Sequence, residues 1–233
     1  MTHNFYTEEL DSFAALAMHW WDPLGPLKTL HQINPIRLCY IKEKIDLNGK
    51  KVIDVGCGGG ILAESLALSG AEVTGIELSK PVIDAAKLHQ LESKTNIEYL
   101  CTAVEDMAMT RAKQYDVVTC LEMLEHVPDP LSVIQACAKL AKPGGHIFFS
   151  TINRNPKAYL FAIVAAEYIL KLLPKQTHDY ARFIRPAELS AWARKAQMQP
   201  QELRGMNYQP FTQQFKLTTD ISVNYFLHAI QTQ

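Results

Sequence analysis

Two carboxylates and an imidazole lie close together in the sequence and could do chemistry. Glu122, Glu125 and His126 occupy positions i, i+3 and i+4, so a helical turn starting at Glu122 would place them on one face. His126 is then a candidate general base. Alternatively, the three side chains could hold a divalent cation such as Mg²⁺, which prefers oxygen ligands. In a third interpretation His126 only packs or caps, beside two solvated glutamates.

A glycine-rich segment gives the strongest signal for ligand binding. The run DVGCGGG, from Asp54 to Gly60, continues an apolar segment that predicts a buried strand. Ligands of open α/β sheets bind beyond the carboxyl ends of strands, where glycines let the backbone approach closely. Glu77, at the end of the next strand, could accept both hydroxyls of a ribose. The candidate ligand-binding residues here are Asp54, Gly56, Gly58, Gly60 and Glu77.

The spacing of these glycines separates two classes of nucleotide site. A dinucleotide site needs GxGxxG, which would place its third glycine at Ile61. The pattern present, DxGxGxG, resembles instead the S-adenosylmethionine (SAM) site of Rossmann-like methyltransferases. That resemblance implies that Thr102, Ala103 and Val104 hold the adenine and that Leu121 lines the methionine part of SAM.

Strands and helices that alternate along the chain must position these residues. Such alternation predicts an α/β fold with a doubly wound, mostly parallel sheet of seven strands. We divide the single domain into a helical lead-in (1–45), a cofactor-binding core (48–153), a helical insertion on the acceptor side (154–198) and a C-terminal antiparallel hairpin (199–233).

Composition excludes several other classes of protein. Hydrophobic residues make up 48% of the 233 residues, as in ordinary globular proteins, and the net charge is -1 without a long basic run. A nucleic-acid partner is therefore not expected. The five cysteines contain no CxxC pair, and the amino terminus has no signal-peptide pattern, which favours a cytoplasmic protein with reduced thiols.

Three segments make the resemblance specific to one family. The lead-in WWDPLGPLKTLHQINPIRL, the segment EMLEHVPDP and the stretch NRNPKAYL to THDYARFIRP resemble the ubiquinone biosynthesis O-methyltransferases, and the match runs from about Phe13 to His228. The family methylates phenolic hydroxyls of polyprenyl catechol and demethylubiquinol intermediates. The resemblance implies SAM contacts at Arg37, Gly56, Glu77 and Leu121, and leans toward dependence on a metal.

The implied substrate raises the question of membrane contact, because a polyprenyl tail resides in a bilayer. The stretch 157–175 predicts an apolar helix with lysines at its ends, which could lie at the inner face of the membrane or serve as an ordinary lid. Trp20 and Trp21 could cover the pocket or belong to the core. His178 and Asp179 form a weaker alternative catalytic pair. Other ubiquinone-biosynthesis enzymes are candidate partners.

Three rival functions remain open at this point. A methyltransferase of small soluble phenols would work independently of the prenyl tail. A SAM-binding module without catalysis would bind SAM without turnover. An NAD-linked oxidoreductase is disfavoured by Ile61.

Overall fold

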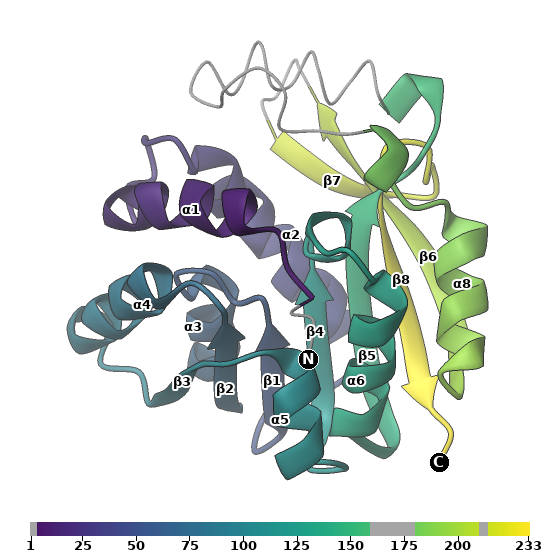
Figure 1. Cartoon of the computed structure of the whole chain (residues 1–233), viewed down its shortest axis with the longest axis horizontal. Coiled ribbons are helices and arrows are strands. Elements are labelled where there is room, and N and C mark those ends of the chain that lie inside the picture. The colour runs from purple at the N-terminus through teal and green to yellow at the C-terminus, as the bar shows by residue number, and fades with distance from the viewer. Residues whose placement is uncertain (1–3, 159–179, 210–213) are drawn as a thin grey trace.

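A mixed sheet of eight strands organises the part of the chain that the structure describes (Figure 1). The computed structural model describes residues 4–158, 180–209 and 214–233. The strand order is β3-β2-β1-β4-β5-β8-β6-β7. The strands are β1 (Lys51–Val55), β2 (Glu72–Glu77), β3 (Ile97–Cys101), β4 (Tyr115–Leu121), β5 (Ala141–Ile152), β6 (Met198–Gln209), β7 (Gln214–Thr218) and β8 (Asn224–Gln231).

The parallel half of the sheet confirms the predicted fold class. Strands β1 to β5 pair in parallel, and β8, β6 and β7 extend the sheet with antiparallel pairs. The predicted count of seven strands is wrong, because the tail 199–233 forms more than a hairpin. The long strand β6 pairs with β8 over Met198–Met206 and with β7 over Gly205–Gln209, so the tail contributes three strands.

Helices cover both faces of the sheet. One core cluster joins α2, α3 and α4 to the sheet, and the other joins α5, α6 and α8 to its opposite face. The helices are α1 (Thr7–Leu16), α2 (Lys28–Lys44), α3 (Ile61–Leu68), α4 (Lys80–Ser93), α5 (Val104–Thr110), α6 (Pro130–Leu140) and α8 (Pro186–Lys195), with 3₁₀ turns η1 (Ala17–His19), η2 (Leu124–His126) and η3 (Tyr180–Arg182).

The central strands are apolar on both faces because each face is covered by helices. Val52 and Val117 belong to the cluster on the α2 side, whereas Ile53 and Val118 belong to the cluster on the α5 side. All four are fully buried, as the strand period of two requires for neighbours that point to opposite faces. This rigid centre fixes the positions of the loops at the carboxyl ends of the strands.

The helical insertion predicted for 154–198 is only partly described. Its second helix is confirmed as α8. The predicted helix 157–175, apart from its first two residues, and the pair His178–Asp179 lie outside the described residues. Among the described helices, none combines the length and the hydropathy that crossing a membrane would require.

Candidate active site

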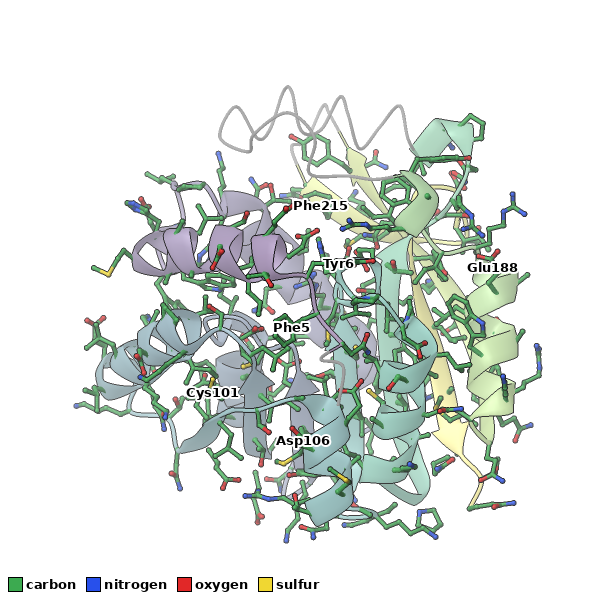
Figure 2. All side chains as sticks on the ribbon, viewed as in Figure 1. Phe5, Tyr6, Cys101, Asp106, Glu188 and Phe215 are labelled. Atoms are coloured by element: carbon green, nitrogen blue, oxygen red, sulfur yellow. The ribbon has the colours of Figure 1, made fainter. Side chains whose placement is uncertain are left out.

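A large cavity of about 1170 Å³ opens at the carboxyl ends of the parallel strands. Its lining comes from segments far apart in the sequence, and five of the residues labelled in Figure 2 belong to it. Phe5 and Tyr6 come from the amino-terminal segment, Cys101 from the end of β3, Asp106 from α5 and Phe215 from β7. The cavity therefore spans both halves of the sheet.

The glycine loop between β1 and α3 forms one wall. Gly56, Gly58 and Gly60 have φ of +69°, +53° and +91°, in the left-handed region that favours glycine. A Cβ atom on Gly58 would lie 2.3 Å from the Trp20 ring. The amides of Gly56 and Cys57 both donate to the Ile76 carbonyl, at 2.9 and 3.0 Å, which anchors the loop to β2.

Two carboxylates near this loop, the buried Asp54 of β1 and the partly buried Glu77 of β2, face the cavity. Asp54 accepts a 2.6 Å hydrogen bond from the Thr119 hydroxyl, and its burial raises its pKa to about 6. Glu77 accepts from the amides of Leu78 and Ser79 at 2.7 and 3.1 Å, and burial raises its pKa as well. Both side chains line the cavity, so they can receive donors from a ligand.

Arg37 on α2 supplies a buried cation in the same cavity. Only 8% of the residue is exposed, and its Nε and Nη2 atoms have no hydrogen-bond partner among the described residues. Burial lowers the pKa of Arg37, while the charges of Glu122, Asp54 and Glu125 oppose that shift. A buried guanidinium with unpaired donors is a suitable partner for a ligand carboxylate. This arrangement fits an amino-acid moiety such as the methionine part of SAM.

The remaining predicted cofactor positions divide into two groups. Thr102, Ala103, Val104 and Leu121 line the cavity, as do Arg37, Asp54, Gly56, Gly58 and Glu77. Gly60 lies outside the lining, where a Cβ atom would come within 2.1 Å of the Tyr99 hydroxyl. The glycine at this position accommodates close packing against β3 as α3 begins.

Glu122 and Glu125 are each held by a hydroxyl of strand β5, and Glu122 is held by β8 as well. Ser150 Oγ donates to Glu122 Oε1 at 2.5 Å, and Asn224 Nδ2 lies 3.1 and 3.0 Å from its two carboxylate oxygens. Glu125 is buried and accepts from the Thr151 hydroxyl at 2.8 Å. Burial and the neighbouring Glu122 raise the pKa of Glu125 to about 7.

His126 takes its partner from the amino-terminal helix. Its Nδ1 lies 3.2 Å from Glu9 Oε2. Burial alone would lower the pKa of His126, but the hydrogen bond to Glu9 and the surrounding carboxylates raise it overall. Glu122, Glu125 and His126 all line the cavity, which places a candidate base and two acids beside the glycine loop.

The predicted helical turn starting at Glu122 is wrong. Glu122 has a φ of +55°, and the 3₁₀ turn η2 spans only Leu124 to His126, so the three side chains do not follow α-helical spacing. Within residues 4–158, 180–209 and 214–233, no group of three His, Cys, Asp or Glu side chains is arranged to hold a metal ion. The side chains predicted to ligate Mg²⁺ are hydrogen-bonded to other residues instead. Glu122 bonds to Ser150 and Asn224, Glu125 to Thr151, and His126 to Glu9.

Comparisons with known proteins show the family of the chain. The family model "Methyltransferase domain" matches residues 35–203. The ubiquinone biosynthesis O-methyltransferase of Pseudomonas savastanoi pv. phaseolicola is 57% identical, over 96% of each chain. That of Marinobacter nauticus is 56% identical, over 99% of this chain and 98% of its own. The chain belongs to the ubiquinone biosynthesis O-methyltransferase family. It is therefore an O-methyltransferase of that pathway.

Solved structures show the same fold at low identity. Magnesium protoporphyrin IX methyltransferase from Synechocystis with bound SAH aligns with a TM-score of 0.69 at 19% identity, over 97% of this chain and 99% of its own. A SAM-dependent methyltransferase from Thermotoga maritima, a possible histamine N-methyltransferase, aligns with a TM-score of 0.67 at 13% identity, over 97% of this chain and 100% of its own.

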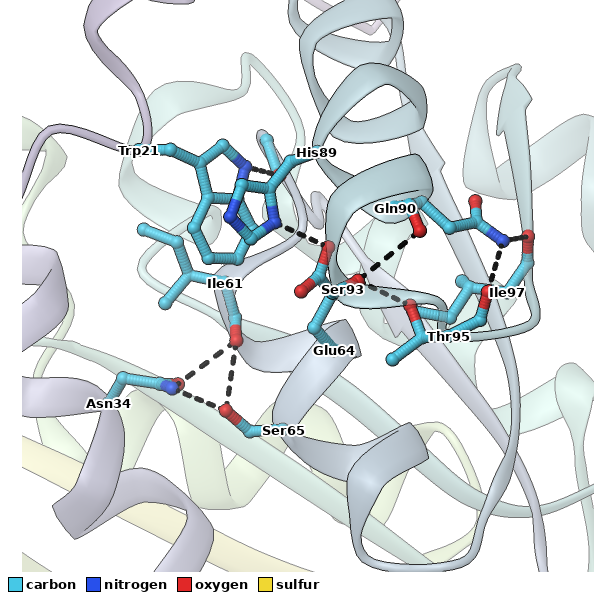
Figure 3. Close-up of polar contacts among 11 residues, drawn as sticks. Trp21, Asn34, Ile61, Glu64, Ser65, His89, Gln90, Ser93, Thr95 and Ile97 are labelled. Atoms are coloured by element: carbon cyan, nitrogen blue, oxygen red, sulfur yellow. Dashed lines mark hydrogen bonds and ion pairs between the residues drawn. The ribbon is translucent and has the colours of Figure 1, made fainter.

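The amino-terminal segment of the methyltransferase contacts the glycine loop through Trp20 and Trp21, and Figure 3 shows the contacts of Trp21. Trp20 is buried against Gly58 and lines the cavity. Trp21 Nε1 donates to the Gly59 carbonyl at 2.8 Å, and its ring stacks on His89 at 3.4 Å between ring centroids. His89 Nδ1 in turn lies 2.8 Å from the buried Glu64 carboxylate. Trp20 lines the cavity and also belongs to a core cluster, against which Trp21 packs, so the two alternatives for the tryptophans are not exclusive.

Several residues of the methyltransferase site were missed in the sequence. Glu9 contacts His126 and Arg182, while Ser150 and Asn224 hold Glu122. These residues are separated in sequence from their partners by between 28 and 173 positions, and no local motif marks them. An alternating pattern along the last strand would indicate only which of its residues face the cavity.

Proposed function

We propose that this methyltransferase transfers the methyl group of SAM to a phenolic oxygen of polyprenyl catechol and demethylubiquinol intermediates. The observation that carries the proposal is one continuous cavity, lined both by the candidate cofactor residues and by the residues of an acceptor end. Its volume of about 1170 Å³ exceeds the roughly 300–1,000 Å³ of an ordinary ligand pocket. That leaves room for an aromatic acceptor beside the cofactor.

The residues of the cavity divide into two roles. Arg37 binds the carboxylate of the methionine part, Glu77 binds the ribose, and Thr102 to Val104 border the adenine. When bound, SAM supplies an electrophilic methyl group on its sulfonium. Phe13, Met206 and Phe215 line the cavity as well and supply apolar surface for the acceptor ring. Holding the acceptor oxygen in line with the methyl group accounts for much of the acceleration expected of such a site.

His126 takes the proton of the acceptor. A phenol ionises near pH ~10, so at neutral pH a base must accept its proton. The proton passes from the phenolic oxygen to His126, the new bond joins that oxygen to the methyl carbon, and the bond from carbon to sulfur breaks. Glu122 and Glu125 face the same cavity and stabilise the imidazolium that results.

One experiment tests the proposal directly. Purified protein is incubated with labelled SAM and a short-chain prenyl catechol, with and without EDTA, and with Mg²⁺ added back. Transfer that ignores EDTA supports His126 as the base. Transfer lost in EDTA and restored by Mg²⁺ would assign the acceptor chemistry to a cation held by rearranged Glu122, Glu125 and His126. Tight SAM binding without any transfer would overturn the acceptor assignment.

We also propose that the acceptor enters from a membrane surface. Lys157, where the stretch 157–175 begins, lines the cavity and donates to Asp220 and Ser222 at 3.1 and 2.7 Å. A prenyl tail leaving the cavity at this rim would emerge where the stretch 157–175, mostly apolar in sequence, begins. Sedimentation with vesicles of anionic lipid should recover the protein, and a catechol without a prenyl tail should be methylated more slowly. Equal rates on both acceptors would contradict this proposal.

A further inference from the structure

One face of helix α1 holds the His126 ring. Glu9 Oε2 lies 3.2 Å from Nδ1 of His126, and the Phe13 ring meets the imidazole edge-on, with 5.6 Å between centroids and 82° between planes. Glu9 and Phe13 are four residues apart, so both project from the same side of the helix. The neighbouring Glu8 is exposed and faces away.

The Glu9 carboxylate is itself fixed from the other side. Arg182 Nη1 donates to Glu9 Oε1 at 2.9 Å, and the Arg182 guanidinium lies 4.2 Å from the centre of the Tyr6 ring. Only 15% of the Glu9 side chain is exposed. Both carboxylate oxygens are thus engaged, one by Arg182 Nη1 and the other by His126 Nδ1, and a carboxylate that faces a guanidinium acts as an acceptor. Glu9 therefore orders one ring nitrogen of His126 as the donor.

We propose that Glu9 is a positioning residue that fixes the tautomer and orientation of His126. The proton of the neutral ring resides on Nδ1, which donates to Glu9, and the lone pair of Nε2 is left for the acceptor end of the cavity. Among the described residues, Nε2 makes no hydrogen bond that would compete. This inference rests on the proposed function, in which His126 acts on the phenol.

Glu9 would hold the ring in the same way whether His126 accepts the proton of the phenol or ligates a cation. A general base needs a free lone pair on one nitrogen and a fixed partner on the other. A histidine that ligates a cation needs the same arrangement, and a carboxylate commonly holds its second nitrogen. In either case α1, which lies more than 100 residues from His126 in sequence, completes the acceptor end. The helix thereby makes the alignment of His126 depend on the packing of the amino-terminal segment.

The test compares Glu9→Ala and Glu9→Gln with a matched control, Glu8→Ala, one position earlier on the same helix. Glu9→Ala should lower kcat on the prenyl catechol about 10- to 100-fold, with the Kd for SAM within about twofold of the parent value. Glu9→Gln should recover part of the loss, because its amide oxygen still accepts from Nδ1. Glu8→Ala should behave like the parent chain.

A spectroscopic measurement separates positioning from stability. In protein labelled with ¹⁵N-histidine, the His126 signals, assigned through His126→Gln, should show protonation at Nδ1 in the parent and in Glu9→Gln. Glu9→Ala should show a mixture of both tautomers. An unchanged kcat or an unchanged tautomer in Glu9→Ala would overturn the inference, as would an equal loss in Glu8→Ala. If the parent chain failed to turn over the catechol, the proposed function would fall, and the tautomer measurement would still decide the role of Glu9.

Discussion

The two ends of the cavity are built in different ways. At the proposed cofactor end, the glycine loop and residues at the carboxyl ends of β1, β2, β3 and β4 line the cavity together with Arg37 of α2, and the loop is hydrogen-bonded to the adjacent strand β2. At the acceptor end, single side chains meet from distant segments. Glu122 and Asn224 are 102 positions apart, His126 and Glu9 are 117, and Arg182 and Glu9 are 173.

This contrast follows from what each end must recognise. A common cofactor can be bound by one contiguous turn, because a glycine-rich backbone approaches it closely wherever the fold recurs. An acceptor differs from enzyme to enzyme, so its contacts come from insertions and added strands. Substitutions at the two ends should therefore have different effects. Those at the cofactor end should change the Kd for SAM, and those at the acceptor end should change kcat.

The largest effect is expected for Gly58→Ala. Its Cβ would lie 2.3 Å from Trp20, in a loop with a φ of +53°, so both the loop and the tryptophan must shift. We expect the Kd for SAM to rise on the order of 100-fold, measured by isothermal titration calorimetry. Gly49→Ala is the matched control, because Gly49 has a similar φ of +67° with nothing within 4 Å. Equal weakening in both variants would assign the effect to backbone strain and not to the Trp20 contact.

The next effect concerns the acceptor end. Asn224→Ala removes both hydrogen bonds from Asn224 to Glu122, whose φ of +55° is unfavourable for a glutamate and depends on such contacts. We expect kcat to fall about 30-fold, about 2 kcal/mol, with the Kd for SAM unchanged. Steady-state kinetics with saturating SAM would measure this.

Asn155→Ala is the control for that variant. Asn155 also makes two hydrogen bonds, to Ser222 and Ala158, but it lies outside the cavity lining. It should reduce stability without changing kcat. A rise in the Kd for SAM in Asn224→Ala would contradict the separation of the two ends.

The same contrast explains what could be predicted from the sequence. The glycine loop, Glu77 and the alternation of strands and helices are local patterns, so the fold class and the candidate cofactor residues of the loop and of β2 could be inferred from them. The geometry around Glu122 could not be predicted, because its left-handed backbone is set by Ser150 and Asn224. An assumed helical turn there gave a ligand set for Mg²⁺ that the described residues do not form.

The third strand of the tail was missed for a related reason. Strand β6 changes its partner from β8 to β7 near Gly205, and both pairings are consistent with one alternating pattern. The role of Glu9 has no local signal either, since its contacts appear only when α1 folds over the sheet. Contacts between distant segments are thus the part of this site that requires a structure.

A buried histidine in the added strands, and not at the cofactor end, should make the free energy of unfolding depend on pH. His228 on β8 is buried, and its Nε2 lies 3.0 Å from Nδ1 of His146 on β5. Burial and the positive charge of a protonated His146 lower the pKa of His228 from 6.5 to about 4. The unfolded chain therefore binds more protons between these values, and the free energy of unfolding falls as the pH drops from 6.5 toward 4.

The His228→Gln variant should lose this dependence. Above pH 6.5 the histidine is neutral in both states and the parent chain is unaffected by its titration. Because of His228, we expect the free energy of unfolding of the parent chain to be about 2 kcal/mol lower at pH 4.5 than at pH 8, measured by urea unfolding. A difference between the parent and His228→Gln that is constant from pH 8 to 4.5 would show that His228 titrates normally.

The smallest effect concerns the contact between Trp21 and the glycine loop, and tests whether that contact serves the cofactor end or the acceptor end of the cavity. Trp21→Phe keeps an aromatic ring over His89 but removes the 2.8 Å hydrogen bond to the Gly59 carbonyl. Because one neutral hydrogen bond contributes about 1 kcal/mol, the Kd for SAM should rise roughly fivefold while kcat at saturating SAM stays the same. Trp192→Phe on α8, where the tryptophan packs against the core cluster on the opposite face, should leave the Kd unchanged. A lower kcat with an unchanged Kd in Trp21→Phe would assign the contact between Trp21 and the glycine loop to the acceptor end, and the amino-terminal segment would then serve His126 alone.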